Sequence, residues 1–214
     1  MEKPRYIVIE GPIGVGKTSL AGLLAKELEA KLFLENAEKN PFLEAFYRQP
    51  DKYAFQTQVF FLLSRFTQQQ ELIQEDLFNQ NTVSDYLFSK DRIFAHINLR
   101  GQELSLYEQI YRLVSWRITS PDLVIYLQAR TEVLLDRIKK RSVPYEKWID
   151  FDYMKKVVDA YNDFFFYYKD SPLLVVNTSD IDFISNREDF EGLIKEIKGT
   201  RRGTWHYIPL GSQR

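Results

Sequence analysis

Short aliphatic and β-branched runs alternate along the chain with longer segments in which apolar residues recur every three or four positions. The short runs predict five strands, at 6–9, 31–35, 82–85, 123–127 and 173–176. The periodic segments predict helices at 19–28, 41–48, 51–76, 103–120, 131–141, 149–169 and 187–198. Strands separated by helices form βαβ units. The sequence therefore predicts an α/β fold, a three-layer sandwich with a five-stranded parallel sheet and helices on both faces.

The chain length and composition predict a single domain over residues 1–214, with a peripheral tail at 199–214. The net charge of −1 gives no support for a nucleic-acid-binding surface. The absence of cysteine excludes disulfides, thiolate zinc sites and cysteine nucleophiles. No apolar stretch of 18 residues occurs. We therefore expect a cytoplasmic protein with no membrane and no nucleic-acid partner.

The segment from Gly11 to Thr18 fits the phosphate-binding loop (P-loop) pattern G-x-x-x-x-G-K-[ST] without a gap, between a predicted strand and a predicted helix. Glycines let backbone N–H groups turn toward phosphate oxygens at a helix N-terminus. Lys17 is expected to reach the β- and γ-phosphates, and the Thr18 hydroxyl to hold Mg²⁺. The sequence thus predicts a nucleoside triphosphate site. Its binding residues are Gly11, Gly14, Gly16, Lys17, Thr18 and Ser19.

Two carboxylates end neighbouring predicted strands, Glu35 after 31–34 and Asp85 after 82–84. Ligands of parallel sheets bind outside the carboxyl ends of the strands, so both acids are expected to face the same crevice as the phosphate loop. There a carboxylate can accept a proton from an attacking hydroxyl or ligate Mg²⁺. Taken singly, such an acid is more often a solvated surface residue or a helix cap, but the pair beside a complete phosphate loop favours a catalytic or metal-binding role.

Several blocks beyond the phosphate loop resemble the deoxyribonucleoside kinases. They are Phe33-Leu-Glu-Asn-Ala-Glu-Lys-Asn-Pro41, Phe55-Gln-Thr-Gln58 through Arg65, Asp91-Arg92-Ile-Phe, and Ile125-Tyr-Leu-Gln followed by Arg137-Ile-Lys-Lys-Arg141. The likeness extends from about Tyr6 to Leu174. It implies transfer of the γ-phosphoryl group of ATP to the 5′-hydroxyl of a deoxyribonucleoside, with Mg²⁺, in nucleotide salvage by a homodimer.

The resemblance also implies roles for individual residues. Glu35 matches the general base that accepts the proton of the 5′-hydroxyl. Tyr47 matches a tyrosine bonded to the 3′-hydroxyl, and Gln58 matches a glutamine that reads the base edge. Arg65, seven residues further on, is expected to pair with Asp91 over the base. Without the family, a polar stripe on an exposed helix would explain Gln58 and Arg65.

A short arginine-containing lid is implied at about 141–149. Arg137 and Arg141 match arginines that clamp the phosphates, for which planar guanidinium groups are well suited. Glu146 matches a lid glutamate that bonds the sugar. Read without the family, these arginines belong to a basic helix end that the helix dipole favours.

The sequence departs from the family at the end of the third predicted strand. The usual acid-Arg-Ser/Thr triplet reads Asp85-Tyr86-Leu87, which keeps the acid for Mg²⁺ and replaces the arginine by an uncharged phenol. Arg92 or a lid arginine could compensate. Val143 also occupies a lid position where many relatives carry arginine. Two alternatives stay open: a nucleoside monophosphate kinase of the same fold, and a non-enzymatic structural subunit.

The expected Arg65–Asp91 pair beside Gln58 indicates which nucleobase the site prefers. Adenine and cytosine offer an exocyclic amine to a carboxylate or amide oxygen, and guanine offers a carbonyl to arginine. Thymine offers carbonyls, a ring N–H and a methyl group that needs apolar room. The sequence therefore predicts a preference for deoxyadenosine or deoxyguanosine, then deoxycytidine, with thymidine poorest.

Overall fold

A six-stranded parallel sheet organises the computed structural model, which describes residues 4–76, 81–181, 183, 186–199 and 202–207. The strand order is β2-β3-β1-β4-β5-β6, and every neighbouring pair is parallel. The central register places Val8 between Ser84 and Val124. The strands are β1 (Tyr6–Glu10), β2 (Lys31–Phe33), β3 (Thr82–Ser84), β4 (Leu123–Gln128), β5 (Leu173–Asn177) and β6 (Thr204–Tyr207).

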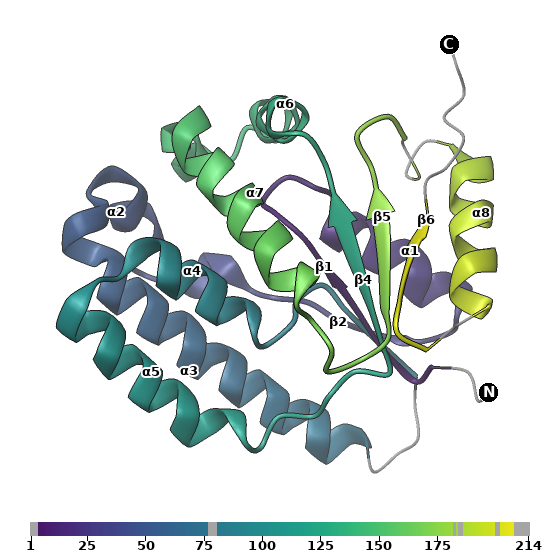
Figure 1. Cartoon of the computed structure of the whole chain (residues 1–214), viewed down its shortest axis with the longest axis horizontal. Helices are drawn as coiled ribbons and strands as arrows, with labels where there is room; N and C mark the ends of the chain where they lie inside the picture. Colours follow the sequence, from purple (N-terminus) through teal and green to yellow (C-terminus); the bar gives the residue numbers. More distant parts are fainter. Residues whose placement is uncertain (1–3, 77–80, 182, 184–185, 200–201, 208–214) are drawn as a thin grey trace.

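Helices cover both faces of the sheet: α7 crosses the face turned toward the viewer in Figure 1, and α1 lies behind the strands. Helices α3, α4 and α5 form a layer beside α7 on the viewer's side. The helices are α1 (Lys17–Glu27), α2 (Leu43–Arg48), α3 (Pro50–Asp76), α4 (Lys90–Asn98), α5 (Gly101–Ser115), α6 (Thr131–Arg141), α7 (Phe151–Phe166) and α8 (Arg187–Lys198), with 3-10 turns η1 (Ala37–Lys39) and η2 (Pro144–Trp148).

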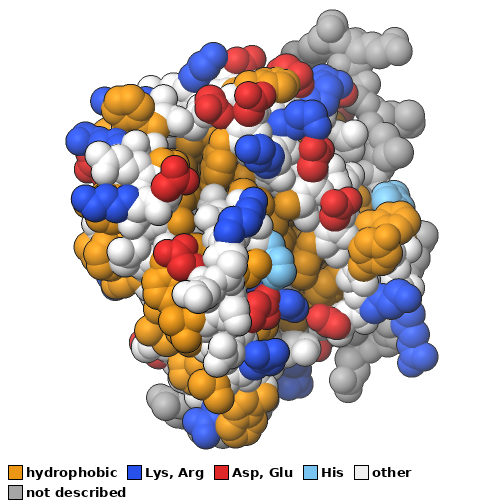
Figure 2. Space-filling model, turned by 60° about the vertical axis from the view of Figure 1, so that its left-hand side comes forward, with side chains coloured by type: hydrophobic (Ala, Val, Ile, Leu, Met, Phe, Trp, Pro, Cys, Tyr) orange, Lys and Arg blue, Asp and Glu red, His pale blue; other side chains and the backbone are white. Residues whose placement is uncertain are grey.

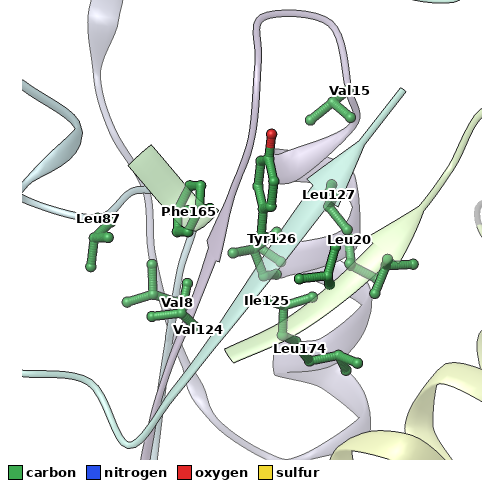
Figure 3. Close-up of a cluster of buried hydrophobic side chains, with 14 of the residues drawn as sticks. Val8, Val15, Leu20, Leu87, Val124, Ile125, Tyr126, Leu127, Phe165 and Leu174 are labelled. Carbon is green, nitrogen blue, oxygen red and sulfur yellow. The ribbon is translucent and has the colours of Figure 1, made fainter. Parts of the chain in front are cut away.

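The main core lies between the sheet and these helices. Central strands covered on both faces must be apolar throughout, and β4 is buried from Leu123 to Leu127. Tyr126 of β4 stacks on Phe165 of α7, with ring centroids 4.1 Å apart. Figure 3 shows Tyr126 among the buried side chains of this cluster, which also contains Val15 of the phosphate loop. The packing that stabilises the sheet thereby also anchors the phosphate loop.

The predicted sheet of five strands was wrong by one strand. Residues 204–207 of the tail form β6, which pairs in parallel with β5 and buries Trp205. The sequence signal was weak because the strand is only 4 residues long and follows charged residues. Residues 200–201 and 208–214 of the predicted tail lie outside the described residues.

Helix α4 was not predicted, although it carries residues of the site described below. The predicted lid segment contains the end of α6, Ser142 in a left-handed conformation (φ 57°) and the turn η2. Its function as a lid stays a prediction. Within the described residues, no helix is both long and apolar enough to span a membrane.

Candidate active site

A cavity of about 370 Å³ opens beyond the carboxyl ends of the strands. Its wall is formed by the loops after β1, β2 and β3, the start of α1, the end of α6, the helices α2, α3, α4 and α7, and the turns η1 and η2. This is the position that parallel α/β sheets use for ligands. Ten predicted site residues line it: Gly14, Lys17, Thr18, Glu35, Tyr47, Gln58, Arg65, Asp85, Arg141 and Glu146.

The phosphate loop joins β1 to α1. Gly11, Gly14 and Gly16 have φ values of 154°, 82° and 102°, which side chains rarely adopt. A Cβ added at Gly11 would lie 2.5 Å from the carbonyl oxygen of Leu127, so this glycine is also required by close packing. Lys17 Nζ donates to the carbonyl oxygens of Gly11 and Pro12, at 2.8 and 3.1 Å. Burial lowers the pKa of Lys17 to about 8, although Glu10 opposes this shift.

Asp85 links two other predicted site residues, Thr18 and Glu35. Its Oδ2 accepts the Thr18 hydroxyl at 2.6 Å, and its Oδ1 accepts the backbone N–H of Glu35 at 2.7 Å. The carboxyl ends of β2 and β3 therefore meet at the start of α1, as their strand-end positions predicted. Ser19, by contrast, is exposed and does not line the cavity.

Glu35 is held by two cations. Arg65 Nε donates to Oε1 at 2.7 Å, with Nη2 also in contact with that oxygen, and Lys90 Nζ donates to Oε2 at 2.5 Å. Burial alone would raise the pKa of Glu35, but Arg65 and Lys90 outweigh it and lower the pKa to about 2. Glu35 is consequently an ionised carboxylate at neutral pH.

Arg65 bridges two acids. Its Nη1 lies 2.5 Å from Oδ1 of Asp91, so the pairing predicted from the sequence is confirmed. Asp91 is fully buried, and burial raises its pKa to about 6 although Arg65 opposes the shift. The same guanidinium holds Glu35 on its other side, a contact that the sequence did not predict.

The part of the cavity around Gln58 and Tyr47, which we call the acceptor end, is lined by polar groups on largely apolar helices. Gln58 of α3 is buried, and within the described part of the chain its Oε1 has no hydrogen-bond partner. Tyr47 of α2 stacks on Tyr145 of η2, with centroids 6.1 Å apart. An unpartnered buried amide oxygen beside aromatic rings suits a flat ligand that carries a hydrogen-bond donor.

The two predicted phosphate-clamping arginines differ in position. Arg141 lies on the cavity wall and pairs with Glu146 through both of its oxygens. Arg137 does not line the cavity: its guanidinium donates to the carbonyl oxygens of Thr178 at 2.8 Å and Val15 at 3.4 Å, beside the phosphate loop.

Sequence reasoning missed two buried charged residues. Glu10, the last residue of β1, accepts the N–H of Gly11 at 2.9 Å through Oε1 and the N–H of Leu87 at 2.8 Å through Oε2. Its position at a strand end was the signal used for Glu35 and Asp85, so it could have been found. Lys90 carries no comparable signal, because a lysine at the start of a helix is common on a surface.

Arg92 does not compensate for the arginine that is absent at position 86. Arg92 Nε pairs with Glu108 of α5 at 3.0 Å, and its side chain is 47% exposed and outside the cavity wall. Tyr86 itself is fully buried, with its ring 6.2 Å from that of Phe33. An aromatic core residue thus occupies the position at which the family resemblance led us to expect a cation.

Comparisons with known proteins agree with this geometry. The family model described as "Deoxynucleoside kinase" matches residues 7–200. A deoxyguanosine kinase of Bacillus subtilis is 34% identical over 92% of this chain and 98% of its own. A deoxyadenosine kinase of Lactobacillus acidophilus is 30% identical over 90% of this chain and 94% of its own. The structure of deoxyadenosine kinase from M. mycoides with bound dATP superposes with a TM-score of 0.75 and 26% identity, over 89% of this chain and 99% of the other.

Proposed function

The chain belongs to the deoxynucleoside kinase family, and from that premise we propose that it transfers the γ-phosphoryl group of ATP to the 5′-hydroxyl of a purine deoxyribonucleoside in nucleotide salvage. The observation that carries this proposal is that one cavity contains both Lys17 of the phosphate loop and the polar acceptor end around Gln58, with Glu35 on the same wall. A nucleoside at Gln58 and ATP on the loop would meet beside Glu35.

The reaction follows from these positions. The 5′-oxygen bonds to the γ-phosphorus, the bond from that phosphorus to the β–γ bridging oxygen breaks, and ADP leaves. The 5′-hydroxyl proton passes to the Glu35 carboxylate. When the hydroxyl displaces a cation from Glu35, the ionised form loses stabilisation and the carboxylate becomes more basic. Lys17 and the loop N–H groups bind the phosphates, where transfer depends chiefly on positioning and charge stabilisation.

Mg²⁺ fits Asp85 and Thr18. A hydroxyl and a carboxylate lie 2.6 Å apart beside the phosphate loop, and Mg²⁺ commonly uses one or two carboxylates together with substrate phosphates. Among the described residues no cluster of three or more His, Asp or Glu forms a dedicated metal cage. When bound, the ion would neutralise phosphate charge.

The preference for purines rests on Gln58, Arg65 and Asp91. Gln58 Oε1 can accept an exocyclic amine, and Arg65, which lines the same cavity from α3, is paired with Asp91 of α4. The relatives named above as deoxyguanosine and deoxyadenosine kinases support the same choice. A buried polar group left unmatched costs about 1–3 kcal/mol, which predicts a ten- to hundredfold loss in kcat/KM for the wrong base.

The test is to measure kcat/KM of the purified protein with ATP and each of the four deoxyribonucleosides, and with the four deoxyribonucleoside monophosphates. Purine nucleosides should rank first, deoxycytidine next and thymidine last. A first rank for thymidine would contradict the roles of Arg65 and Asp91. A first rank for any monophosphate would point to the alternative kinase reaction.

A homodimer is also part of the proposal. Figure 2 shows hydrophobic side chains gathered on the side of the molecule that carries α2, α3 and α5. Exposed large apolar residues on α3 and α5 are Leu63, Leu106 and Leu113, followed by Trp116. Apolar surface of this kind marks interaction sites. Sedimentation equilibrium should give twice the mass of 25.4 kDa, and a single-chain mass would exclude the dimer.

A further inference from the structure

We propose that Lys90 is a catalytic residue of this kinase, the cation that contacts the 5′-oxygen and the transferred phosphoryl group in place of the arginine absent at position 86. The inference rests on the proposed function and adds to it a residue that sequence reasoning did not identify. Lys90 lines the same cavity as Lys17 and Glu35.

The burial of Lys90 has no structural benefit of its own. It is only 3% exposed and is the first residue of α4, where the helix dipole disfavours a positive charge. Removing an ammonium from water is costly unless it is paired. The structure meets that cost with Glu35, whose Oε2 accepts Lys90 Nζ at 2.5 Å. A buried ion pair adds little stability compared with an apolar pair, so its retention in a ligand cavity favours a chemical role.

The two cations that contact Glu35, Arg65 and Lys90, are held differently and can serve different functions. Arg65 binds Oε1 and is tied on its other side to Asp91, so it is fixed in α3. Lys90 binds Oε2, and it lies close enough to Lys17 for its charge to help lower the pKa of Lys17. Lys90 is therefore the cation that can turn from Glu35 toward a γ-phosphate while Arg65 continues to hold the carboxylate.

Tyr86 supports Lys90 at this place. Lys90 Nζ lies 5.8 Å from the centroid of the Tyr86 ring, within the range of a cation–π contact. Tyr86, which stands where the family has arginine, thus provides an aromatic ring that the Lys90 ammonium contacts. The positive charge of Lys90 thus lies four residues after position 86, at the first residue of α4, and contacts the carboxylate of Glu35.

In the step, Lys90 is not consumed and transfers no proton. The 5′-oxygen bonds to the γ-phosphorus, the bond to the bridging oxygen of ADP breaks, and Glu35 takes the hydroxyl proton. The 5′-hydroxyl displaces Lys90 from Oε2 of Glu35 before the transfer, and the ammonium then contacts the phosphoryl oxygens, whose charge it stabilises. Once Lys90 has left, the carboxylate is more basic and can accept the hydroxyl proton.

The experiment compares wild type with Lys90→Met, Lys90→Gln and Lys90→Arg, and uses Lys195→Met on the exposed face of α8 as the matched loss of a lysine. Turnover with ATP and deoxyguanosine is measured, together with calorimetric affinities for deoxyguanosine and for dGMP, whose 5′-phosphate would meet Lys90. Melting temperatures establish that each variant folds, and Lys90→Gln replaces Lys90→Met if the latter does not.

We expect the neutral variants to lower kcat by about a hundredfold, as for other transition-state charge contacts. They should weaken dGMP about tenfold while deoxyguanosine changes far less, and Lys90→Arg should recover most of both losses. Neutral variants with nearly wild-type kcat, or equal losses for deoxyguanosine and dGMP, would overturn the inference. Failure of the wild type to phosphorylate any deoxyribonucleoside would instead overturn the proposed function, and the ratio of dGMP to deoxyguanosine affinity would still test Lys90.

Discussion

The carboxylate of Asp85 fixes the backbone of Glu35, because Oδ1 of Asp85 accepts the Glu35 N–H at 2.7 Å. The other oxygen of Asp85 accepts the Thr18 hydroxyl at 2.6 Å. One side chain thus sets the distance between the proposed proton acceptor and the phosphate loop. Reactions that depend on positioning are sensitive to such a link, since small displacements of reacting groups can cost large factors in rate.

Lys17→Ala should abolish phosphoryl transfer, because it deletes the ammonium that would reach the β- and γ-phosphates. The expected fall in kcat/KM is about a hundredfold or more. Steady-state kinetics with deoxyguanosine and varied ATP measures it. Lys26→Ala, on the exposed side of the same helix α1, is the matched control and should behave as wild type. Retention of more than about a tenth of the activity would contradict the role of Lys17.

Glu35→Gln should leave nucleoside affinity nearly intact while kcat falls by about a hundredfold or more, since the amide keeps the shape of the carboxylate and loses its basicity. Arg65 retains its ion pair with Asp91 in this variant, which limits the structural damage. Stopped assays for kcat and calorimetry for nucleoside binding separate the two effects, with exposed Glu103→Gln as control. Equal losses in affinity and turnover would indicate a purely structural glutamate.

Tyr86→Arg should lower both activity and melting temperature. Tyr86 is fully buried against Phe33, and an arginine there would place a third cation beside Arg65 and Lys90. Tyr86→Phe keeps the ring and should remain close to wild type. Kinetics and thermal melting of the two variants decide the matter. A faster Tyr86→Arg enzyme would show that the family's arginine can simply be restored.

Two glycines should respond oppositely to alanine. Gly11→Ala places a Cβ 2.5 Å from the Leu127 carbonyl oxygen at a φ of 154°, so a loss of about 2 kcal/mol or more in unfolding free energy is expected. Gly22, inside α1, has nothing within 4 Å of an added Cβ, and Gly22→Ala should gain about 0.5–1 kcal/mol. Urea unfolding measures both. Equal responses would mean that packing at the loop does not require glycine.

The pKa of Glu35 predicts a pH dependence of stability. The folded-state pKa is about 2, below the ordinary 4.5 of a glutamate, so the ionised pairs with Arg65 and Lys90 stabilise the fold above pH 4.5. That contribution is lost as the pH falls from 4.5 toward 2. The unfolding free energy of wild type should therefore fall more than that of Glu35→Gln between pH 6 and pH 3. Parallel pH profiles would show that Glu35 is not held in the ionised form.

The sequence predicted the parallel sheet from local signals, and it predicted ten of the residues that line the cavity partly from local signals and partly from the family resemblance. The glycine loop requires its residues by backbone geometry, and acids at strand ends must meet at one edge of a parallel sheet. Gln58 and Arg65 could be placed on one face of α3 by helical spacing and by the family resemblance. These positions are confirmed as neighbours in space, whereas their individual roles in catalysis stay predictions.

What the sequence did not predict depends on contacts between distant residues. The contact of Arg65 with Glu35 joins α3 to the loop after β2, and no spacing along the chain indicates it. The pairing of Arg65 with Asp91 was predicted only through the family resemblance. Lys90 resembles an ordinary surface lysine until α4 buries it against Glu35. Strand β6 is too short for its pattern to compete with the charged residues before it, and only its pairing with β5 defines it.

Glu10 bears on whether the loops of the active site become ordered during folding or only when the nucleotide binds. Its two carboxylate oxygens accept the backbone N–H groups of Gly11 and Leu87, which lie in loops after different strands, and the residue is fully buried. The Glu10 carboxylate thus accepts a hydrogen bond from one backbone N–H of the phosphate loop, that of Gly11. These hydrogen bonds form when the chain folds, so the phosphate loop and the segment that carries Asp85 lose their conformational entropy during folding. A nucleotide that binds later does not have to order these two loops, so less of its binding free energy is spent on ordering them.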